Sequence, residues 1–122
     1  MSRFIKSVGY AWRGIKNCLA SEPNFKIHIS CGVLVLIAGF IFKISIHEWL
    51  AVLLCIGFVL SMEMLNTAIE KLCDVVYKEF HPGIRVTKDI AAGAVLVSAI
   101  IAAVCAAIIF IPKIISLFQS YL

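Results

Sequence analysis

Four polar side chains share one face of an otherwise apolar segment: Glu63, Asn66, Glu70 and Asp74. If residues 49–74 form an α-helix, a rotation of about 100° per residue places the three carboxylates within about 40° of one another, with Asn66 about 60° from Glu63. Carboxylates are costly in or near a bilayer, so an acidic stripe on such a helix indicates a functional site.

Such a stripe would suit chemistry on a phosphate group that carries a divalent metal. Mg²⁺ is usually held by one or two carboxylates together with phosphate oxygens of the substrate. The carboxylates that could take part are Glu22, Glu70, Asp74 and Asp89. Lys88 and Arg3 could offset the phosphate charge. Neither the P-loop motif nor the glycine-rich loop of protein kinases is present, so a kinase of either common type is not expected.

Glu63 differs from the other acids in its depth. A helix that starts at Trp49 rises about 21 Å before it reaches Glu63, which places this carboxylate well across the bilayer and near the far interface. Phosphoryl transfer needs mainly positioning, electrostatic stabilisation and a base that accepts the hydroxyl proton. Loss of hydration would make Glu63 a stronger base, which predicts a role as general base toward a lipid hydroxyl.

The same polar groups have two other interpretations. Glu63 and Asn66 could be hydrogen-bonding groups that hold the helices of a structural assembly together. Glu63 could also carry the proton of a small proton-coupled transporter. Several acids gathered near the interface, instead of one acid at mid-membrane, argue against the transporter. The residues alone leave the lipid-directed enzyme, the transporter and the assembly open.

The composition is that of a small membrane protein. The chain has 122 residues, of which 62% are hydrophobic and 15% charged, and its mean hydropathy is +1.04. Soluble domains usually have about a quarter of their residues charged. We therefore expect an all-α membrane protein with a single domain, 1–122, and no cleaved signal peptide. The five cysteines show no metal-ligand spacing and are expected to pack as small apolar residues.

Hydrophobic periodicity predicts an amphipathic surface helix and three membrane spans. Residues 2–21 have apolar residues at three- and four-residue steps with basic residues between them, which favours a helix in the plane of the interface. Three apolar stretches that could cross a hydrocarbon core of about 30 Å follow at 25–42, 49–72 and 90–111.

Short polar segments are expected around these spans. Ser21 or Glu22 would cap the helix that follows Pro23. Residues 75–89 would form a polar connection broken at its His-Pro-Gly sequence. After Pro112 the chain is expected to end in a short tail.

Basic residues predict the orientation of the chain. The formal net charge is +4, and the N-terminal segment and residues 70–89 hold most of the Lys and Arg. Positive charge favours the cytoplasmic side, so both segments are expected there and the C-terminus on the opposite side. The basic N-terminal segment also suits anionic lipid head groups. Nucleic-acid binding is not expected, because no module that could enter a groove is present.

The acidic stripe and its surroundings resemble the prokaryotic diacylglycerol kinase family, which consists of small integral membrane lipid kinases. The motif is Glu63-x-Leu65-Asn66-Thr67-Ala68-Ile69-Glu70-x-x-x-Asp74. The similarity continues in Gly9-Tyr10-x-Trp12-x-Gly14, in Glu22-x-x-Phe25, and in Lys88-Asp89 with the Ala-rich segment after it. It covers essentially the whole chain.

The resemblance implies a homotrimer in the bacterial cytoplasmic membrane, with active sites shared between subunits. Such a kinase transfers the γ-phosphate of MgATP to a lipid hydroxyl in phospholipid or cell-envelope lipid metabolism. By resemblance, Glu63 is the catalytic base, Glu22 and Glu70 hold Mg²⁺, and Asn66 and Asp74 support them. The implied ATP-binding residues are Arg3, Tyr10, Glu22, Glu70, Glu79, His81, Lys88 and Asp89. The implied lipid-binding residues are Arg3, Trp12, Phe25, Glu63 and Ala92.

Two departures from the family pattern bear on the acceptor lipid. Ile27-His28 stands where the diacylglycerol-specific branch has Gln-Glu, and the segment from Phe25 to His28 is more similar to the branch that favours undecaprenol. Cys73 replaces a usual valine, which is a conservative packing change. The acceptor is therefore expected to be undecaprenol or diacylglycerol.

Overall fold

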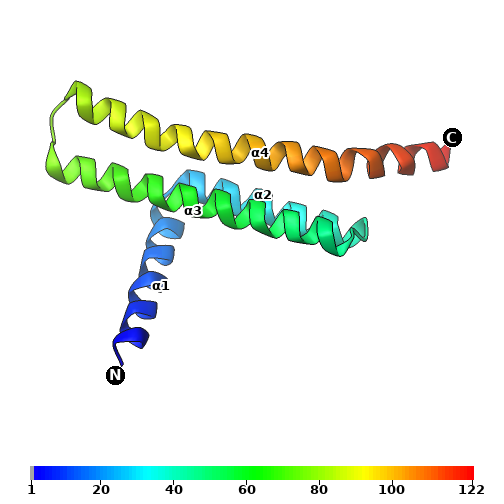
Figure 1. The fold of residues 1–122 in the computed structure, drawn as a ribbon, viewed down its shortest axis with the longest axis horizontal. Helices are drawn as coiled ribbons and strands as arrows, with labels where there is room; N and C mark the ends of the chain where they lie inside the picture. Colours follow the sequence, from blue (N-terminus) through cyan, green and yellow to red (C-terminus); the bar gives the residue numbers. More distant parts are fainter. Residues whose placement is uncertain (1) are drawn as a thin grey trace.

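A computed structural model describes residues 2–122, which form four helices joined by short turns. They are α1 (Arg3–Ser21), α2 (Pro23–Ile41), α3 (Ile46–Val76) and α4 (Pro82–Tyr121). Helices α2, α3 and α4 lie side by side, whereas α1 leaves the bundle at a steep angle (Figure 1). Helices α2, α3 and α4 are each long and apolar enough to cross a membrane. This arrangement confirms the predicted all-α fold with an N-terminal helix and three transmembrane helices.

Side-chain caps set the starts of α1 and α3. At α1, the Ser2 hydroxyl accepts a hydrogen bond from the backbone N–H of Ile5 at 3.2 Å. At α3, the Glu48 N–H donates to the Ser45 hydroxyl at 3.2 Å, and the Ser45 N–H donates to the Glu48 carboxylate at 2.9 Å. This reciprocal pair is a capping box, which satisfies two backbone donors that the first turn leaves free.

The connection between α3 and α4 is shorter than the predicted 75–89. Helix α4 already starts at Pro82, so only residues 77–81 connect the two helices. Pro82 begins the helix instead of breaking it, because a first-turn proline lacks only an N–H that would have no helical partner. His81 caps this start, since its Nδ1 accepts a hydrogen bond from the Gly83 N–H at 3.0 Å.

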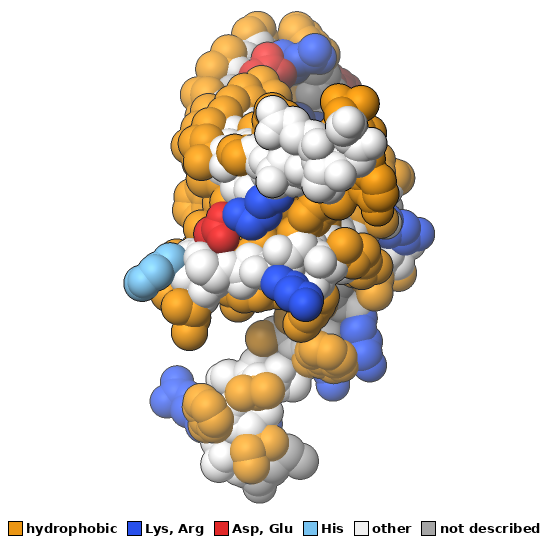
Figure 2. Space-filling view, turned by 90° about the vertical axis from the view of Figure 1, so that its right-hand side faces the viewer, with side chains coloured by type: hydrophobic (Ala, Val, Ile, Leu, Met, Phe, Trp, Pro, Cys, Tyr) orange, Lys and Arg blue, Asp and Glu red, His pale blue; other side chains and the backbone are white. Residues whose placement is uncertain are grey.

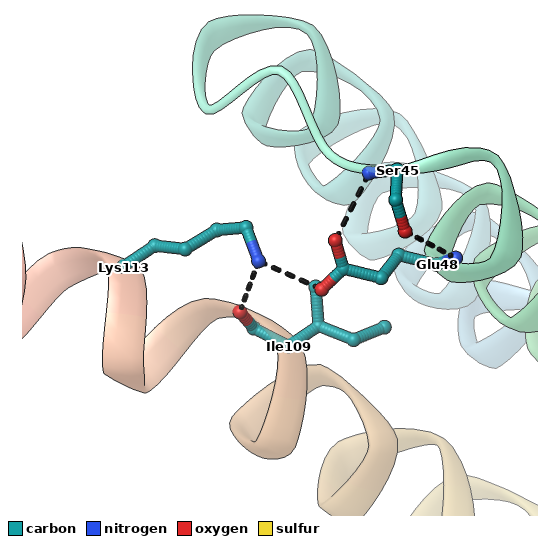
Figure 3. A network of polar contacts seen from close by, with 4 residues as sticks. All are labelled: Ser45, Glu48, Ile109 and Lys113. Atoms are coloured by element: carbon teal, nitrogen blue, oxygen red, sulfur yellow. Dashed lines mark hydrogen bonds and ion pairs between the residues drawn. The ribbon is translucent and has the colours of Figure 1, made fainter.

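The predicted short tail after Pro112 is wrong, because α4 continues to Tyr121. A proline removes one helical hydrogen bond but does not prevent the helix from resuming. The side chain of Lys113 stabilises this region. Its ammonium donates a hydrogen bond to the Ile109 carbonyl at 3.2 Å and forms an ion pair with the Glu48 carboxylate at 2.7 Å (Figure 3). The ion pair ties α4 to the capped start of α3.

The apolar core lies at the end of the bundle where α3 begins. Its buried centre consists of Ile44, Val52, Ile109 and Phe110. Gly39 on α2 is buried beside this core and allows the Trp49 ring to approach the α2 backbone. A Cβ atom at Gly39 would lie 2.7 Å from Cη2 of Trp49, closer than van der Waals contact. The Trp49 ring in turn packs on Phe40, with ring centroids 4.8 Å apart.

We expect Gly39→Ala to destabilise the protein by about 1–3 kcal/mol, because overpacking forces a rigid ring and its neighbours to move. Gly57→Ala is the matched control, since a Cβ at Gly57 meets nothing within 4 Å. Alanine is the better helix former by about 1 kcal/mol, so the control should be neutral or slightly stabilising. Thermal unfolding in detergent distinguishes the two variants, and equal midpoints would contradict the contact.

The outer surface of the bundle is apolar along its length. Seen from the end where the C-terminus lies, hydrophobic side chains dominate the visible flanks, with a few charged side chains between them (Figure 2). Large hydrophobic side chains that are more than two-thirds exposed include Phe40, Leu54, Ile90 and Ile108. A surface of this kind suits contact with lipid or with other membrane helices.

Candidate active site

Glu63 lies at the level where α2 begins, at the boundary of the apolar bundle. The residue is 2% exposed, so it is the most deeply buried acid in the described chain. The Nε2 atom of His28, on α2, lies 3.8 Å from Oε2 of Glu63. Helices α2 and α3 are antiparallel, which brings the first turns of one against the middle of the other.

Asn66 and Thr67 continue the polar region one turn further along α3. The Asn66 amide donates to a Glu70 carboxylate oxygen at 3.5 Å. Both Asn66 and Thr67 are buried, yet Oδ1 of Asn66 and Oγ1 of Thr67 have no hydrogen-bond partner within residues 2–122. Buried polar atoms normally have partners, so each of these two atoms could take part in a further hydrogen bond.

Asp74 and Lys88 form an ion pair between α3 and α4, with 2.5 Å between Oδ1 and Nζ. The side chain of Lys88 is about one-third exposed and that of Asp74 two-thirds exposed. Asp89, next to Lys88, pairs with Arg85 on the same helix at 3.4 Å. The predicted charge-balancing lysine and the predicted supporting acid therefore contact each other directly.

Glu22 lies at the junction of α1 and α2. It occupies the predicted capping position before Pro23, but its side chain makes no capping hydrogen bond. The neighbouring Cys18 thiol is buried, and burial, followed by the charge of Glu22, raises its pKa above the usual thiol value. Glu63 raises the pKa of Cys18 as well, so Glu22 and Glu63 both lie within electrostatic range of one thiol.

Two carboxylates in this region could hold a metal ion. Within residues 2–122, neither Glu22 nor Glu70 forms an ion pair with a cationic side chain. The same residues contain no group of three or more His, Cys, Asp or Glu side chains that could form a complete metal cage. A Mg²⁺ ion that arrives with a nucleotide needs fewer protein ligands, since phosphate oxygens supply the others. The pair of free carboxylates fits that requirement.

Several predicted site residues lie away from this cluster. Arg3, Tyr10 and Trp12 are exposed on α1, where Tyr10 lies under Arg13 and Trp12 under Lys16. Their side chains make no contact with Glu63 or Glu70 of the same chain. Other predicted residues have separate positions: Phe25 is buried at the start of α2, Ala92 is exposed on α4, and Glu79 and His81 lie in the connection before α4.

An apolar cavity of about 320 Å³ lies between α2, α3 and α4. His28 lines it at the end nearest Glu63. The rest of its lining consists of aliphatic side chains, one glycine and the thiols of Cys31, Cys55 and Cys105. The cavity therefore has an apolar lining and reaches His28, which lies beside the buried Glu63 carboxylate.

Two contacts were not predicted from the sequence as parts of the site. Only the antiparallel register of α2 and α3 reveals the contact of His28 with Glu63. Lys71 donates a hydrogen bond to Oδ1 of Asn17 at 2.9 Å, which links α1 to α3. No sequence motif marks this second pair.

The structure combines three membrane-spanning helices, a buried carboxylate beside an apolar cavity, and further acids at the adjacent surface. This is the layout of an enzyme that acts on a membrane lipid. Residues 9–110 match the sequence profile of the prokaryotic diacylglycerol kinase family. The chain belongs to this family.

Characterised relatives agree with this assignment. The chain is 43% identical to an undecaprenol kinase of Bacillus subtilis (strain 168) over 113 residues, which cover 93% of this chain and 92% of the relative. It is 32% identical to a diacylglycerol kinase of Escherichia coli (strain K12) over 111 residues, with 84% of each chain covered. These matches confirm the predicted ATP-dependent phosphotransferase that acts on the alcohol group of a lipid, and they give no support to the transporter.

Proposed function

We propose that this kinase transfers the γ-phosphate of ATP, bound with Mg²⁺, to the hydroxyl of undecaprenol, with diacylglycerol as the poorer acceptor. The observation that carries the proposal is the buried Glu63 carboxylate beside His28, which lines an apolar cavity. The similarity to an undecaprenol kinase over nearly the full length supports the same acceptor.

The lining of the cavity favours a polyprenol. An undecaprenol carries one hydroxyl on a hydrocarbon chain, so a single polar end and an apolar body suffice to bind it. Diacylglycerol carries two ester groups close to its hydroxyl, and burying them without hydrogen-bond donors is unfavourable. Apart from its cysteine thiols, the cavity offers one polar side chain, His28.

The roles of the residues follow from their positions. Glu63 would accept the proton of the lipid hydroxyl as its oxygen bonds to phosphorus. Glu22 and Glu70 would hold the metal, and the Asn66 amide orients Glu70. A bound Mg²⁺ would neutralise charge on the phosphate groups. Lys88, held by Asp74, would lie at the surface from which the nucleotide arrives.

The remaining predicted residues suggest a site built from more than one copy. Arg3, Tyr10 and Trp12 are distant from Glu63 in their own chain, and two buried atoms of Asn66 and Thr67 lack partners within it. We therefore propose a homotrimer in which α1 of one copy completes the site of its neighbour. Arg3, Tyr10, Glu79, His81 and Asp89 would then contact ATP, and Arg3, Trp12, Phe25 and Ala92 the lipid.

The proposed placement is the bacterial cytoplasmic membrane, with the N-terminus and the acidic end of α3 on the cytoplasmic side. Basic residues on α1 and around the α3–α4 connection support this orientation. The membrane-crossing parts of the single domain would be residues 25–42, 49–72 and 90–111.

The purified protein in lipid nanodiscs with MgATP should phosphorylate undecaprenol with a kcat/KM at least about tenfold higher than for diacylglycerol, because unpaired buried ester groups cost on the order of 1–3 kcal/mol. Transfer of labelled γ-phosphate to each lipid, measured in matched nanodiscs, gives the ratio. Equal efficiencies, or a preference for diacylglycerol, would contradict the proposed acceptor while leaving the lipid kinase in place.

A further inference from the structure

One side-chain hydrogen bond between distant parts of the chain joins α1 to the acidic end of α3. Lys71 Nζ donates to Oδ1 of Asn17 at 2.9 Å, across 54 positions of sequence. The rest of α1 is exposed except for Cys18, which follows Asn17 and is 7% exposed. Helix α1 is therefore docked on the bundle only by its last turn.

The same bond fixes the position of a cation beside the proposed metal site. Lys71 follows Glu70 directly on α3. Its positive charge lowers the pKa of Cys18, whereas the charges of Glu22 and Glu63 raise it. The Lys71 ammonium nevertheless pairs with neither Glu22 nor Glu70, because it is directed at the Asn17 amide.

We propose that Asn17 and Lys71 are positioning residues of the kinase, with two linked effects. Their hydrogen bond docks α1 and so sets the place of Glu22, whose carboxylate makes no capping bond of its own. It also holds the Lys71 ammonium away from Glu22 and Glu70, which stay free for a metal-bound nucleotide. The second effect rests on the function proposed above for these carboxylates.

Asn17→Ala tests both effects. The freed ammonium should pair with Glu70 or Glu22, and KM for MgATP should rise about three- to tenfold, the range expected for one hydrogen bond, while kcat stays within twofold. Amide hydrogen exchange of residues 14–22 should accelerate, because α1 is no longer docked. Asn17→Asp, which keeps an acceptor and adds an attractive charge, should match the wild type in both measurements.

Adding Lys71→Gln to Asn17→Ala separates docking from charge. The double variant should have a KM for MgATP between those of Asn17→Ala and the wild type, since the competing cation is gone but Glu22 is still not held by docked α1, while exchange in α1 stays fast. Asn24→Ala is the control, because Asn24 is exposed and makes no side-chain hydrogen bond in the described chain. Unchanged exchange and KM in Asn17→Ala would overturn the proposal, as would a KM in the double variant that is as high as in Asn17→Ala.

Failure of the proposed carboxylate roles would look different. Glu70→Gln would then leave the dependence of the rate on Mg²⁺ unchanged, whereas hydrogen exchange in Asn17→Ala would still decide whether Asn17 docks α1.

Discussion

Glu63→Gln should reduce kcat for lipid phosphorylation by a factor of about 10² to 10⁴, the range typical for loss of a general base. Glutamine has nearly the same size and can occupy the same buried place beside His28, 3.8 Å away in the wild type. It cannot accept the hydroxyl proton. Because Glu63 lies deeper than the proposed metal carboxylates, nucleotide binding should be largely retained, as measured by equilibrium binding of a non-hydrolysable ATP analogue with Mg²⁺.

Glu48→Gln is the matched control for this variant. It makes the same chemical change on the same helix, at the opposite end, where Glu48 caps α3 and pairs with Lys113 (Figure 3). The control should lose thermal stability and keep turnover. A Glu63→Gln protein as active as this control would refute the assigned base.

Glu70→Gln should lower kcat/KM for MgATP by about 10², because a charged group that stabilises the transferring phosphate typically contributes this much. In the wild type, a carboxylate oxygen of Glu70 accepts a hydrogen bond from the Asn66 amide at 3.5 Å. The side-chain oxygen of the introduced glutamine can accept the same hydrogen bond. The variant loses the negative charge that a hard cation requires. The concentration of Mg²⁺ needed for half-maximal rate should rise, which a titration at fixed ATP measures.

Lipid dependence distinguishes a metal ligand from a merely structural residue at position 70. KM for undecaprenol should change little in Glu70→Gln, since the cavity and His28 lie on the other side of Glu63. A variant with an unchanged Mg²⁺ requirement and a weakened lipid KM would show that Glu70 acts on the lipid side instead.

Much of the fold could be predicted because the physics of the bilayer constrains it strongly. Uninterrupted apolar stretches of the right length require membrane helices, and the acidic stripe was visible from helical periodicity alone. The depth of Glu63 in the bilayer was predicted from the rise per residue, and the structure shows that this residue is buried among the helices. The sequence did not predict which residues of different helices contact each other. The contact of His28 with Glu63 and that of Asn17 with Lys71 were found only in the structure.

Helix ends were the least predictable part. Pro82 was interpreted as a break, whereas it is the first residue of α4, and Pro112 lies inside that helix. A proline can begin a helix or lie within one, and the neighbouring contacts differ at the two positions. His81 caps the start of α4 at Pro82, and Lys113 donates a hydrogen bond to the Ile109 carbonyl beside Pro112. The capping box of Ser45 and Glu48 could have been found from its three-residue spacing.

The role of α1 also depends on information beyond a single chain. Sequence similarity implied that Arg3, Tyr10 and Trp12 belong to the active site, yet these residues are exposed on α1, which leaves the bundle at a steep angle (Figure 1). In the proposed homotrimer these residues would act on a neighbouring copy, and the contacts of one copy cannot place them. Within residues 2–122, the buried atoms Oδ1 of Asn66 and Oγ1 of Thr67 also lack hydrogen-bond partners.

Single-turnover transfer of labelled phosphate to undecaprenol tests the central claim most directly. Wild-type protein and Glu63→Gln would be compared in nanodiscs with lipid and MgATP both saturating, so that differences in binding do not contribute. The wild type should form undecaprenyl phosphate at least about 100 times faster than the variant. Transfer by Glu63→Gln within tenfold of the wild-type rate would contradict the assignment of Glu63 as the base at the end of the lipid cavity.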